Sequence, residues 1–282
     1  MNRRASSEGT GAAGEVRIQP AEMDRLQKAV RVCKLCANEA TLIDAHVIPR
    51  SFWEIDHAVP PPKMVTNIKG VFPKRIPIGV YDQTILCDRC ERGFSDYDSY
   101  AAELLLSRCK EYVKVRDDNG KLTGYLHHDC DYRRLKLFVI AVLWRASASS
   151  HPFFSRVQLG AFERKAREML LRRDPGNATT FSVLFSIWDS PVIMDPFVER
   201  WDGVRAYRFY LGRFVAYIKV DRRPFPGPFA KAVLSPNGPL HLISRELAAS
   251  KDFRVAAHVM AANQLQILPA ALGARKPWHQ GQ

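Results

Sequence analysis

Two short stretches, Cys33-Lys34-Leu35-Cys36 and Cys87-Asp88-Arg89-Cys90, dominate the first part of this 282-residue chain. Each C-x2-C pair presents two thiolates on one tight turn, and four thiolates complete a tetrahedral zinc site. Two such pairs in one chain favour structural zinc over the alternatives, which are redox dithiols and free buried thiols. Residues 37–86 separate the pairs, a longer stretch than the roughly 15–20 residues of a compact zinc ribbon. We therefore expect a zinc fold with secondary structure of its own between the pairs.

The residues between the two pairs predict a β-hairpin with a long insertion. We expect strands over 41–46 and 80–87, and a short helix over 50–55 that begins after a proline. Residues 58–78 are rich in proline and contain no acidic side chain, which is typical of an ordered loop or insertion. A long amphipathic helix is expected over 91–112. We call each C-x2-C pair a knuckle. The predicted order is a knuckle, a hairpin, a second knuckle and a helix, which is the layout of a treble clef, a ββα-metal finger.

Beyond this finger, the patterns predict helices and a small antiparallel sheet, so the chain is expected to be α+β. Asp118-Asn119-Gly120 predicts a hairpin turn, and the nearly all-apolar helix expected over 132–147 should be buried. The other predicted elements are helices over 21–32, 161–173 and 246–262, and strands over 181–188, 206–211, 214–220 and 231–234, so that strands occupy 180–235. We divide the chain into a disordered start (1–20), a zinc finger domain (21–115) that carries the insertion, and a basic α+β domain (116–282).

Composition and charge narrow the class of protein. With 46% hydrophobic and 25% charged residues, the chain is not disordered throughout. The longest apolar run, Leu137–Trp144, is far shorter than the ~20 residues that cross a bilayer. The polar first residues show no signal peptide, so we expect a cytoplasmic protein with reduced cysteines. The net charge of +13 favours a polyanionic partner such as nucleic acid, and a basic surface kept for solubility stays open as the alternative.

One histidine lies between the knuckles in a position that suggests chemistry. The stretch Leu42-Ile43-Asp44-Ala45-His46-Val47-Ile48-Pro49 places it late in a strand and just before a turn that begins with proline. Here the sequence resembles the HNH, or His-Me finger, endonucleases, which are built on a treble clef. The resemblance covers residues 30–100. The chain also resembles a group of bacterial HNH-family proteins of undetermined role, through its "HVIPRSFW" stretch and the apolar helix downstream.

The resemblance implies metal-dependent hydrolysis of DNA phosphodiester bonds. His46 matches the catalytic histidine, which as a general base takes a proton from water. Glu91, directly after the last cysteine, matches the position that holds a divalent ion such as Mg²⁺ or Mn²⁺. Asp82 stands where asparagine is usual, and we expect it, or a backbone carbonyl, to orient the histidine ring. Further predicted phosphate contacts, which are cations near the hairpin and in the insertion, are Arg50, Lys63, Lys69, Lys74 and Arg75.

One residue departs from the family pattern. Ala45 occupies a position where these enzymes usually carry a metal ligand, which leaves Glu91 as the single ligand that the sequence places. Asp98 shares the helix face of Glu91, but in one straight helix the two are ~10.5 Å apart along the axis, too far to share an ion.

Less specific interpretations therefore stay open. His46 is also explained by a hydrogen bond within the hairpin, Glu91 by the positive end of its helix, and the cations by an ordinary solvated surface. The aromatic strands after residue 180 predict sheet core rather than platforms on which bases stack. The alternative functions are a catalytically inactive treble-clef module that binds nucleic acid or a protein partner, and a structural zinc protein in a larger assembly or homo-oligomer.

Overall fold

The computed structural model describes residues 30–53, 63–64, 74–75, 79–201, 203–225 and 227–262. The predicted disorder of residues 1–20, most of the helix predicted over 21–32, and Lys69 lie outside these ranges. Within the insertion, β4 (Lys63–Met64) and β5 (Lys74–Arg75) pair antiparallel.

The first described element corrects a prediction. Val30–Val32 forms β1 and pairs antiparallel with β2 (Glu39–Thr41), so the chain enters the first cysteine pair from a strand and not from a helix. Because the first pair lies between these two strands, it forms the tip of a hairpin.

A second, shorter hairpin carries the histidine. β3 (Ala45–His46) pairs antiparallel with β6 (Tyr81–Asp82), and a 3-10 turn over Arg50–Phe52 replaces the predicted helix over 50–55. Main-chain hydrogen bonds extend the pairing on both sides, from Ile43 N–H to Leu86 O (3.0 Å) and from Val47 N–H to Val80 O (3.4 Å). The two predicted strands therefore run side by side, with little regular strand in either.

The single helix predicted over 91–112 is wrong. The chain forms four short helical segments instead, because it bends at Gly93 and Phe94 and then widens into a π turn. These segments are α2 (Asp88–Arg92), α3 (Ser95–Ala102), η2 (Glu103–Ser107) and η3 (Arg108–Glu111). The apolar spacing continues across the bend, which is why periodicity alone joined them.

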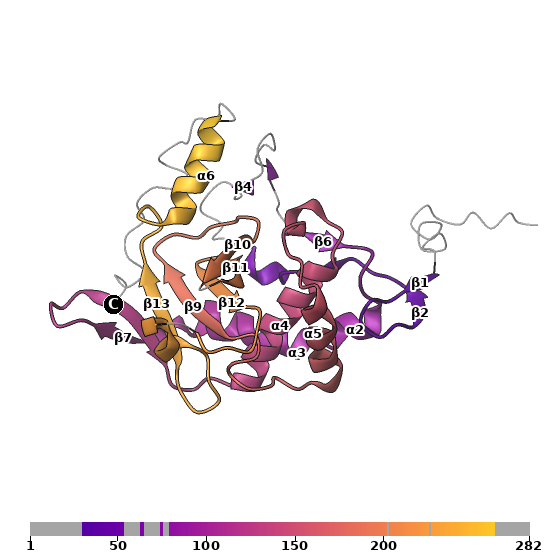
Figure 1. The fold of residues 1–282 in the computed structure, drawn as a ribbon, viewed down its shortest axis with the longest axis horizontal. Helices are drawn as coiled ribbons and strands as arrows, with labels where there is room; N and C mark the ends of the chain where they lie inside the picture. The colour runs from indigo at the N-terminus through magenta and orange to yellow at the C-terminus, as the bar shows by residue number, and fades with distance from the viewer. Residues whose placement is uncertain are drawn as a thin grey trace, which may run out of the picture.

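A seven-stranded sheet forms the second half of the molecule, in the order β10-β11-β12-β9-β13-β8-β7 (Figure 1). It is antiparallel except that β13 runs parallel to β9. The strands are β7 (Val113–Arg116), β8 (Leu122–His127), β9 (Val183–Trp188), β10 (Phe197–Trp201), β11 (Val204–Leu211), β12 (Phe214–Lys219) and β13 (Leu240–Arg245). The predicted α+β class and largely antiparallel sheet are confirmed.

Sequence analysis missed two strands of this sheet and placed one wrongly. β10 (FVERW) and β13 (LHLISR) are short, and neither alternates apolar and polar residues regularly, so no strand pattern stands out. Lys231–Leu234 is no strand, because η5 (Gly227–Ala232) occupies its first half and no strand covers the rest. The domain division at 115/116, which falls inside β7, stays a prediction.

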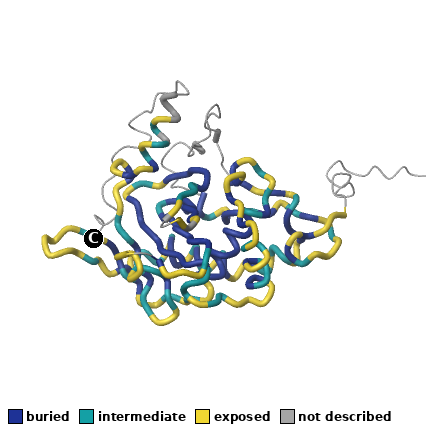
Figure 2. Tube along the Cα trace, in the orientation of Figure 1, coloured by how far each residue is buried: buried dark blue, intermediate teal, exposed yellow. Residues whose placement is uncertain are grey.

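Helix α4 (Tyr132–Ala148) is the centre of the core, as its apolar sequence predicts. It is buried along almost all its length, and both α3 and α5 (Ala161–Arg172) pack against it. One hydrophobic cluster runs from the first knuckle through α4 to one face of the sheet. Figure 2 shows this continuous buried interior.

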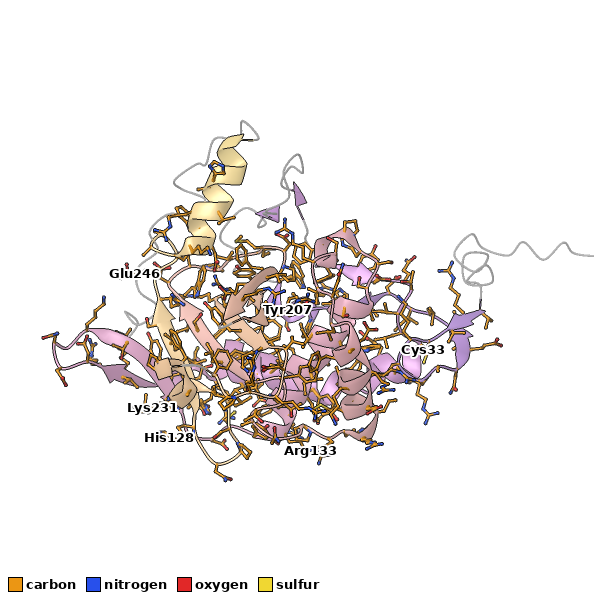
Figure 3. The ribbon with its side chains drawn as sticks, in the orientation of Figure 1. Cys33, His128, Arg133, Tyr207, Lys231 and Glu246 are labelled. Atoms are coloured by element: carbon orange, nitrogen blue, oxygen red, sulfur yellow. The ribbon has the colours of Figure 1, made fainter. Side chains whose placement is uncertain are left out.

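The other face of the sheet is buried as well. A second cluster, which includes Trp188, Tyr210 and Tyr217, lies on that face, and α6 (Lys251–Ala262) follows nearby in the chain. The aromatic strand residues are therefore sheet core, as predicted, and Figure 3 places Tyr207 in the middle of the molecule. Within the described part of the chain, no helix combines the length and apolarity that crossing a bilayer requires.

Candidate metal centre and the histidine hairpin

The first cysteine pair is held in a tight turn by the main chain. Cys33 N–H donates to Asn38 O, and Ala37 N–H donates to Cys33 O, each at 2.9 Å. Ala37 adopts a left-handed conformation (φ 64°), which is unusual for a residue with a Cβ and strains the turn by about 1 kcal/mol. Lys34 N–H donates to Ile85 O (2.9 Å), which ties this turn to the strand before the second pair.

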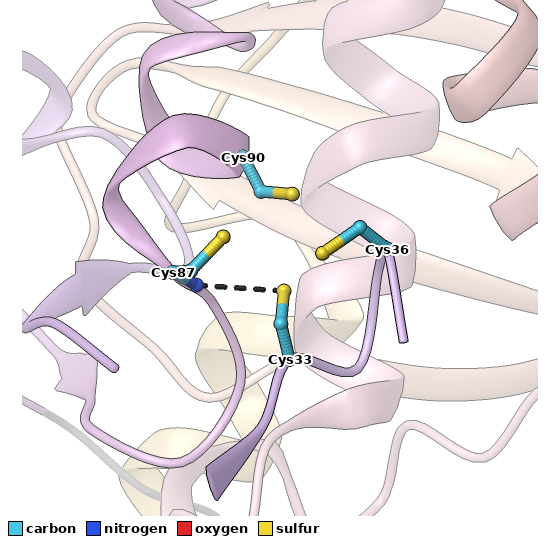
Figure 4. Close-up of side chains that lie close together, drawn as sticks. All are labelled: Cys33, Cys36, Cys87 and Cys90. Carbon is cyan, nitrogen blue, oxygen red and sulfur yellow. Dashed lines mark hydrogen bonds between the residues drawn. The ribbon is translucent and has the colours of Figure 1, made fainter. Parts of the chain in front are cut away.

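The second pair begins a helix, and its sulfurs face the first pair. Cys87 is the N-cap of α2, so Cys90 follows on the first turn. All four Sγ atoms lie within 4.8 Å of one another, and Cys87 N–H donates to Cys33 Sγ at 3.4 Å (Figure 4). Zinc–sulfur bonds of about 2.3 Å in a tetrahedron place sulfurs roughly 3.8 Å apart, which this cluster allows. The predicted cluster of four cysteines is confirmed, and its donor set fits an ion such as zinc.

The protonation of the cluster also favours a cation. Burial opposes ionisation of Cys33, but main-chain N–H groups of Cys36, Cys87 and Leu35 outweigh it and lower the pKa of Cys33 to about 7. Burial raises the pKa of Cys87 and of Cys90, and the neighbouring sulfurs contribute to the rise. Four thiolates packed this closely repel one another, and a divalent cation relieves that repulsion.

Two helices of the core clamp the first knuckle, a feature that sequence analysis missed. Lys34 Nζ donates to Ala148 O at the end of α4 (2.5 Å). Arg167 Nε, from α5, donates to the carbonyls of Leu35 (2.6 Å) and Lys34 (3.1 Å). Arg167 is therefore a structural donor to the first cysteine pair rather than part of a solvated basic face.

His46 sits half-buried on β3, beside α4. Its register partner is Tyr81, whose ring centroid lies 6.1 Å from that of the histidine. The carbonyl of His46 accepts a hydrogen bond from Arg145 Nη1 (3.0 Å). The main chain of the predicted general base is thus fixed from inside the core.

Glu91 contacts the main chain of the same residue. The main-chain N–H of His46 donates to the Glu91 carboxylate, and burial raises the pKa of Glu91, with Asp98 adding to the rise while Arg145 opposes it. Its Oε2 is buried and has no hydrogen-bond partner among the described residues. A buried carboxylate oxygen without a donor is rare and calls for an explanation, such as a proton or a bound cation.

Arg145 connects these groups, and sequence analysis assigned it no role in the site. It is fully buried, pairs through both terminal nitrogens with Asp98 (3.0 and 2.9 Å), and donates from Nε to Ala141 O (3.3 Å). Its guanidinium lies 5.1 Å from the centroid of the Phe94 ring. The signal in the sequence that could have predicted this ion pair is a single arginine at the end of an apolar helix. A charge in a buried helix requires a partner of opposite charge.

The bend after α2 changes the expectation for Asp98. We placed it too far from Glu91 on the assumption of one straight helix. Because the chain bends at Gly93, both carboxylates come to face the guanidinium of Arg145.

Asp82 is an anchor between the hairpin and the end of α4. Its register partner is Ala45 rather than His46. It accepts hydrogen bonds from Thr84 N–H (2.7 Å) and Oγ1 (2.6 Å), Ser149 Oγ (2.6 Å), and Ser150 N–H (2.8 Å) and Oγ (3.3 Å). Burial opposes ionisation, but these donors outweigh it and lower the pKa of Asp82 to about 2. These contacts favour a structural role, and orientation of the His46 ring by Asp82 stays a prediction.

The predicted phosphate contacts are less defined. Arg50 is exposed at the start of its 3-10 turn, and Lys63, Lys74 and Arg75 are described only as backbone in β4 and β5. Asp44 accepts a hydrogen bond from Gln83 Nε2 (2.6 Å), and Ala45 is fully buried. The structure therefore brings together the four cysteines, and separately His46, Glu91, Asp98 and Arg145.

Comparison with known proteins adds no relative. No protein-family model matches the chain, and neither the curated proteins nor the solved structures include a match.

Proposed function

We propose that this protein is a zinc-stapled endonuclease of the HNH type that hydrolyses DNA with His46 as general base. The observation that carries the proposal is the placement of Glu91. This residue follows the last zinc-site cysteine, receives the main-chain N–H of His46, and keeps one buried oxygen that has no partner among the described residues. The order of knuckle, hairpin, second knuckle and helix supports a treble-clef finger as the scaffold.

In this proposal each residue has a defined task. His46 takes a proton from water as the water oxygen bonds to phosphorus and the bond from phosphorus to the leaving oxygen breaks. The leaving oxygen takes its proton from solvent. Glu91, with its unpartnered oxygen, would hold a divalent ion such as Mg²⁺ or Mn²⁺, and that ion would supply neutralisation of phosphate charge. Arg145 fixes the main chain of His46 and offsets part of the negative charge of the two carboxylates near it.

One observation favours a second function, a non-catalytic zinc module that binds nucleic acid or a protein. The guanidinium of Arg145 already lies beside Glu91, and its positive charge weakens the attraction of that carboxylate for a cation. Ala45 supplies no second ligand. In this alternative Glu91 serves only to hold the histidine hairpin against α2.

A plasmid-nicking assay with Mg²⁺ or Mn²⁺ separates the two functions. We expect wild type to nick DNA, and His46→Ala and Glu91→Gln to lose at least ~100-fold in rate, as removal of a general base does. His128→Ala is the matched control, because His128 is exposed and lies far from Cys33 (Figure 3). Thermal melting and zinc content confirm that each variant is folded. Equal rates in all four proteins, or none in wild type with either ion, would exclude the nuclease.

A further inference from the structure

An open pocket of about 420 Å³ lies at the β10 edge of the sheet, outside the site described above. Strands β10 and β11 form one wall and the segment before α5 forms the other. Its lining includes three arginines and no acid among the described residues: Ser155, Arg156, Gln158, Val198, Arg200 and Arg205. The pocket therefore concentrates positive charge on one surface.

Two of these arginines face each other directly. Arg200 and Arg205 are register partners on β10 and β11, and like charges in this position destabilise a strand pair. Their hydrogen bonds go to neutral carbonyls, from Arg200 Nη1 to Gly203 O (2.9 Å) and from Arg205 Nη1 to Gln158 O (2.6 Å). Neither bond cancels the charge.

The acids nearest in sequence leave this pair without a described counter-ion. Glu199 belongs to the other face of β10, where it pairs with Arg208. Asp202 lies outside the described residues. A bound anion would explain this exposed cross-strand pair of arginines, because it would neutralise the repulsion between the two guanidinium groups.

We infer that this arginine pocket binds a phosphate group of a nucleic-acid backbone. Guanidinium groups bind phosphate through two parallel hydrogen bonds, and two facing arginines offer two such forks. The inference that the pocket binds an oxyanion rests on the pocket alone. The inference that this oxyanion is a phosphate of nucleic acid rests on the proposed function.

The pocket is connected to the histidine hairpin by one short segment. Ser149 and Ser150 hydrogen-bond Asp82, the neighbour of Tyr81 on β6, and Ser155 already lines the pocket. Five residues span at most roughly 18 Å. A backbone phosphate in the pocket and a second phosphate at the hairpin are therefore within reach of one strand.

DNA binding in the His46→Ala background tests the inference without cleavage. Fluorescence anisotropy with a labelled duplex is expected to show about tenfold weaker binding for Arg200→Gln and for Arg205→Gln. Each variant should also reduce the salt slope of log K by about 0.9, the value for one lost phosphate contact. Arg116→Gln is the matched control, because Arg116 also donates to a carbonyl of its own hairpin turn (Gly120 O, 2.7 Å), at the opposite edge of the sheet.

A charge reversal separates binding from folding. Arg200→Glu places an acid opposite Arg205, so we expect an unchanged or higher melting temperature together with DNA binding weaker than in Arg200→Gln. If the pocket variants bind DNA as well as Arg116→Gln does, the pocket is no phosphate site, while the proposed function still stands. If the parent fails to bind DNA at all, the nucleic-acid partner is wrong, and the inference falls with it.

Discussion

Among the described residues two arginines are buried, one on each side of the sheet, and they differ in how completely their partners satisfy them. Arg208 on β11 pairs with both Glu199 and Asp252 and lies 5.3 Å from each of the rings of Phe197 and Tyr217. All its acids are hydrogen-bonded to it, so this cluster is closed and anchors the start of α6 to the sheet.

Arg145 is arranged differently. It hydrogen-bonds one acid, Asp98, and its other donors bond main-chain carbonyls, while one oxygen of Glu91 has no partner in the part of the chain that the structure describes. We call a cluster closed when all its carboxylates are hydrogen-bonded within it, and open when one carboxylate oxygen is left over. The difference indicates that a closed cluster serves as an anchor, whereas an open cluster can still bind a ligand. The open cluster is the one that adjoins the cysteines and His46.

Metal removal should produce the largest loss of stability, and the loss should be greatest in the half of the molecule that contains Arg145 and the cysteines. Cys87→Ser breaks the four-sulfur cluster, and structural zinc sites contribute about 10 kcal/mol or more in small zinc domains. We expect wild type to contain about one equivalent of zinc and the variant none. Hydrogen exchange should accelerate in residues 30–53 and 79–111 and change less in β11 and β12.

Cys109→Ser is the control for this experiment, because Cys109 is half-buried and outside the cluster. It should keep both zinc and exchange protection. A wild-type protein purified without metal would refute the site.

Truncating the two arginines compares the clusters directly. Arg145→Met and Arg208→Met each leave buried carboxylates without their cation, a change that costs about 3–5 kcal/mol. Urea unfolding should show similar losses for both. Only Arg145→Met should reduce nicking beyond what the loss of folded protein explains, since only Arg145 holds His46.

Arg164→Met, at a side chain that is 87% exposed, should change neither property. Equal loss of nicking in both arginine variants, at matched folded fraction, would contradict the distinction between an open and a closed cluster.

Lys136 is another buried cation and sharpens the comparison, because its hydrogen bond goes to a neutral carbonyl, Phe181 O (2.5 Å). Burial lowers its pKa from 10.5 to about 7. The folded state therefore holds fewer protons than the unfolded state between pH 7 and 10.5, so stability rises with pH across that window. Lys136→Met should stabilise the protein by about 2–4 kcal/mol at pH 6, and the gain should disappear near pH 10.5.

Chemical unfolding at both pH values measures this, with Lys165→Met as the exposed control. A stability difference that is the same at pH 6 and pH 10.5 would show that Lys136 does not titrate in this way.

Asp82 offers the smallest and best-defined effect. Its pKa is lowered from 3.8 to about 2, so its contribution is complete above pH 3.8 and is lost as the pH falls towards 2. Linkage puts this contribution at about 2 kcal/mol. Asp82→Asn should be less stable than wild type by about that amount at pH 6, with the two curves converging near pH 2.

Asp44→Asn is the control, because Asp44 is joined to the hairpin by one exposed hydrogen bond. If Asp82→Asn were as stable as wild type at pH 6, the hydrogen bonds of the Asp82 carboxylate would contribute nothing to stability.

The sequence allowed some of this to be predicted, and the reasons are physical. The cysteine cluster follows from spacing alone, because ligand geometry restricts how two C-x2-C pairs can meet. Helices α4 and α5 and the β7–β8 hairpin have long or sharply marked patterns, and all three are confirmed. Short strands such as β10 lack that length.

The clusters around Arg145 and Arg208 could not be predicted from the sequence, for a different reason. Arg145 and Asp98 are 47 residues apart, and Arg145 and His46 are 99 apart. No local pattern reports contacts of that kind. The bend at Gly93, which brings Asp98 towards Glu91, leaves the apolar periodicity intact and is therefore invisible to it.

The clamp on the first knuckle has a kinetic consequence. The carbonyls of Lys34 and Leu35 are held by Arg167, and the Lys34 side chain is tied to the end of α4. An ion held by the four sulfurs would therefore be slow to leave, because this turn is tied to two core helices. Its escape rate is then governed by a local opening of the core rather than by the strength of the metal–sulfur bonds, so a chelator should strip the protein slowly and at a rate that scarcely depends on chelator concentration.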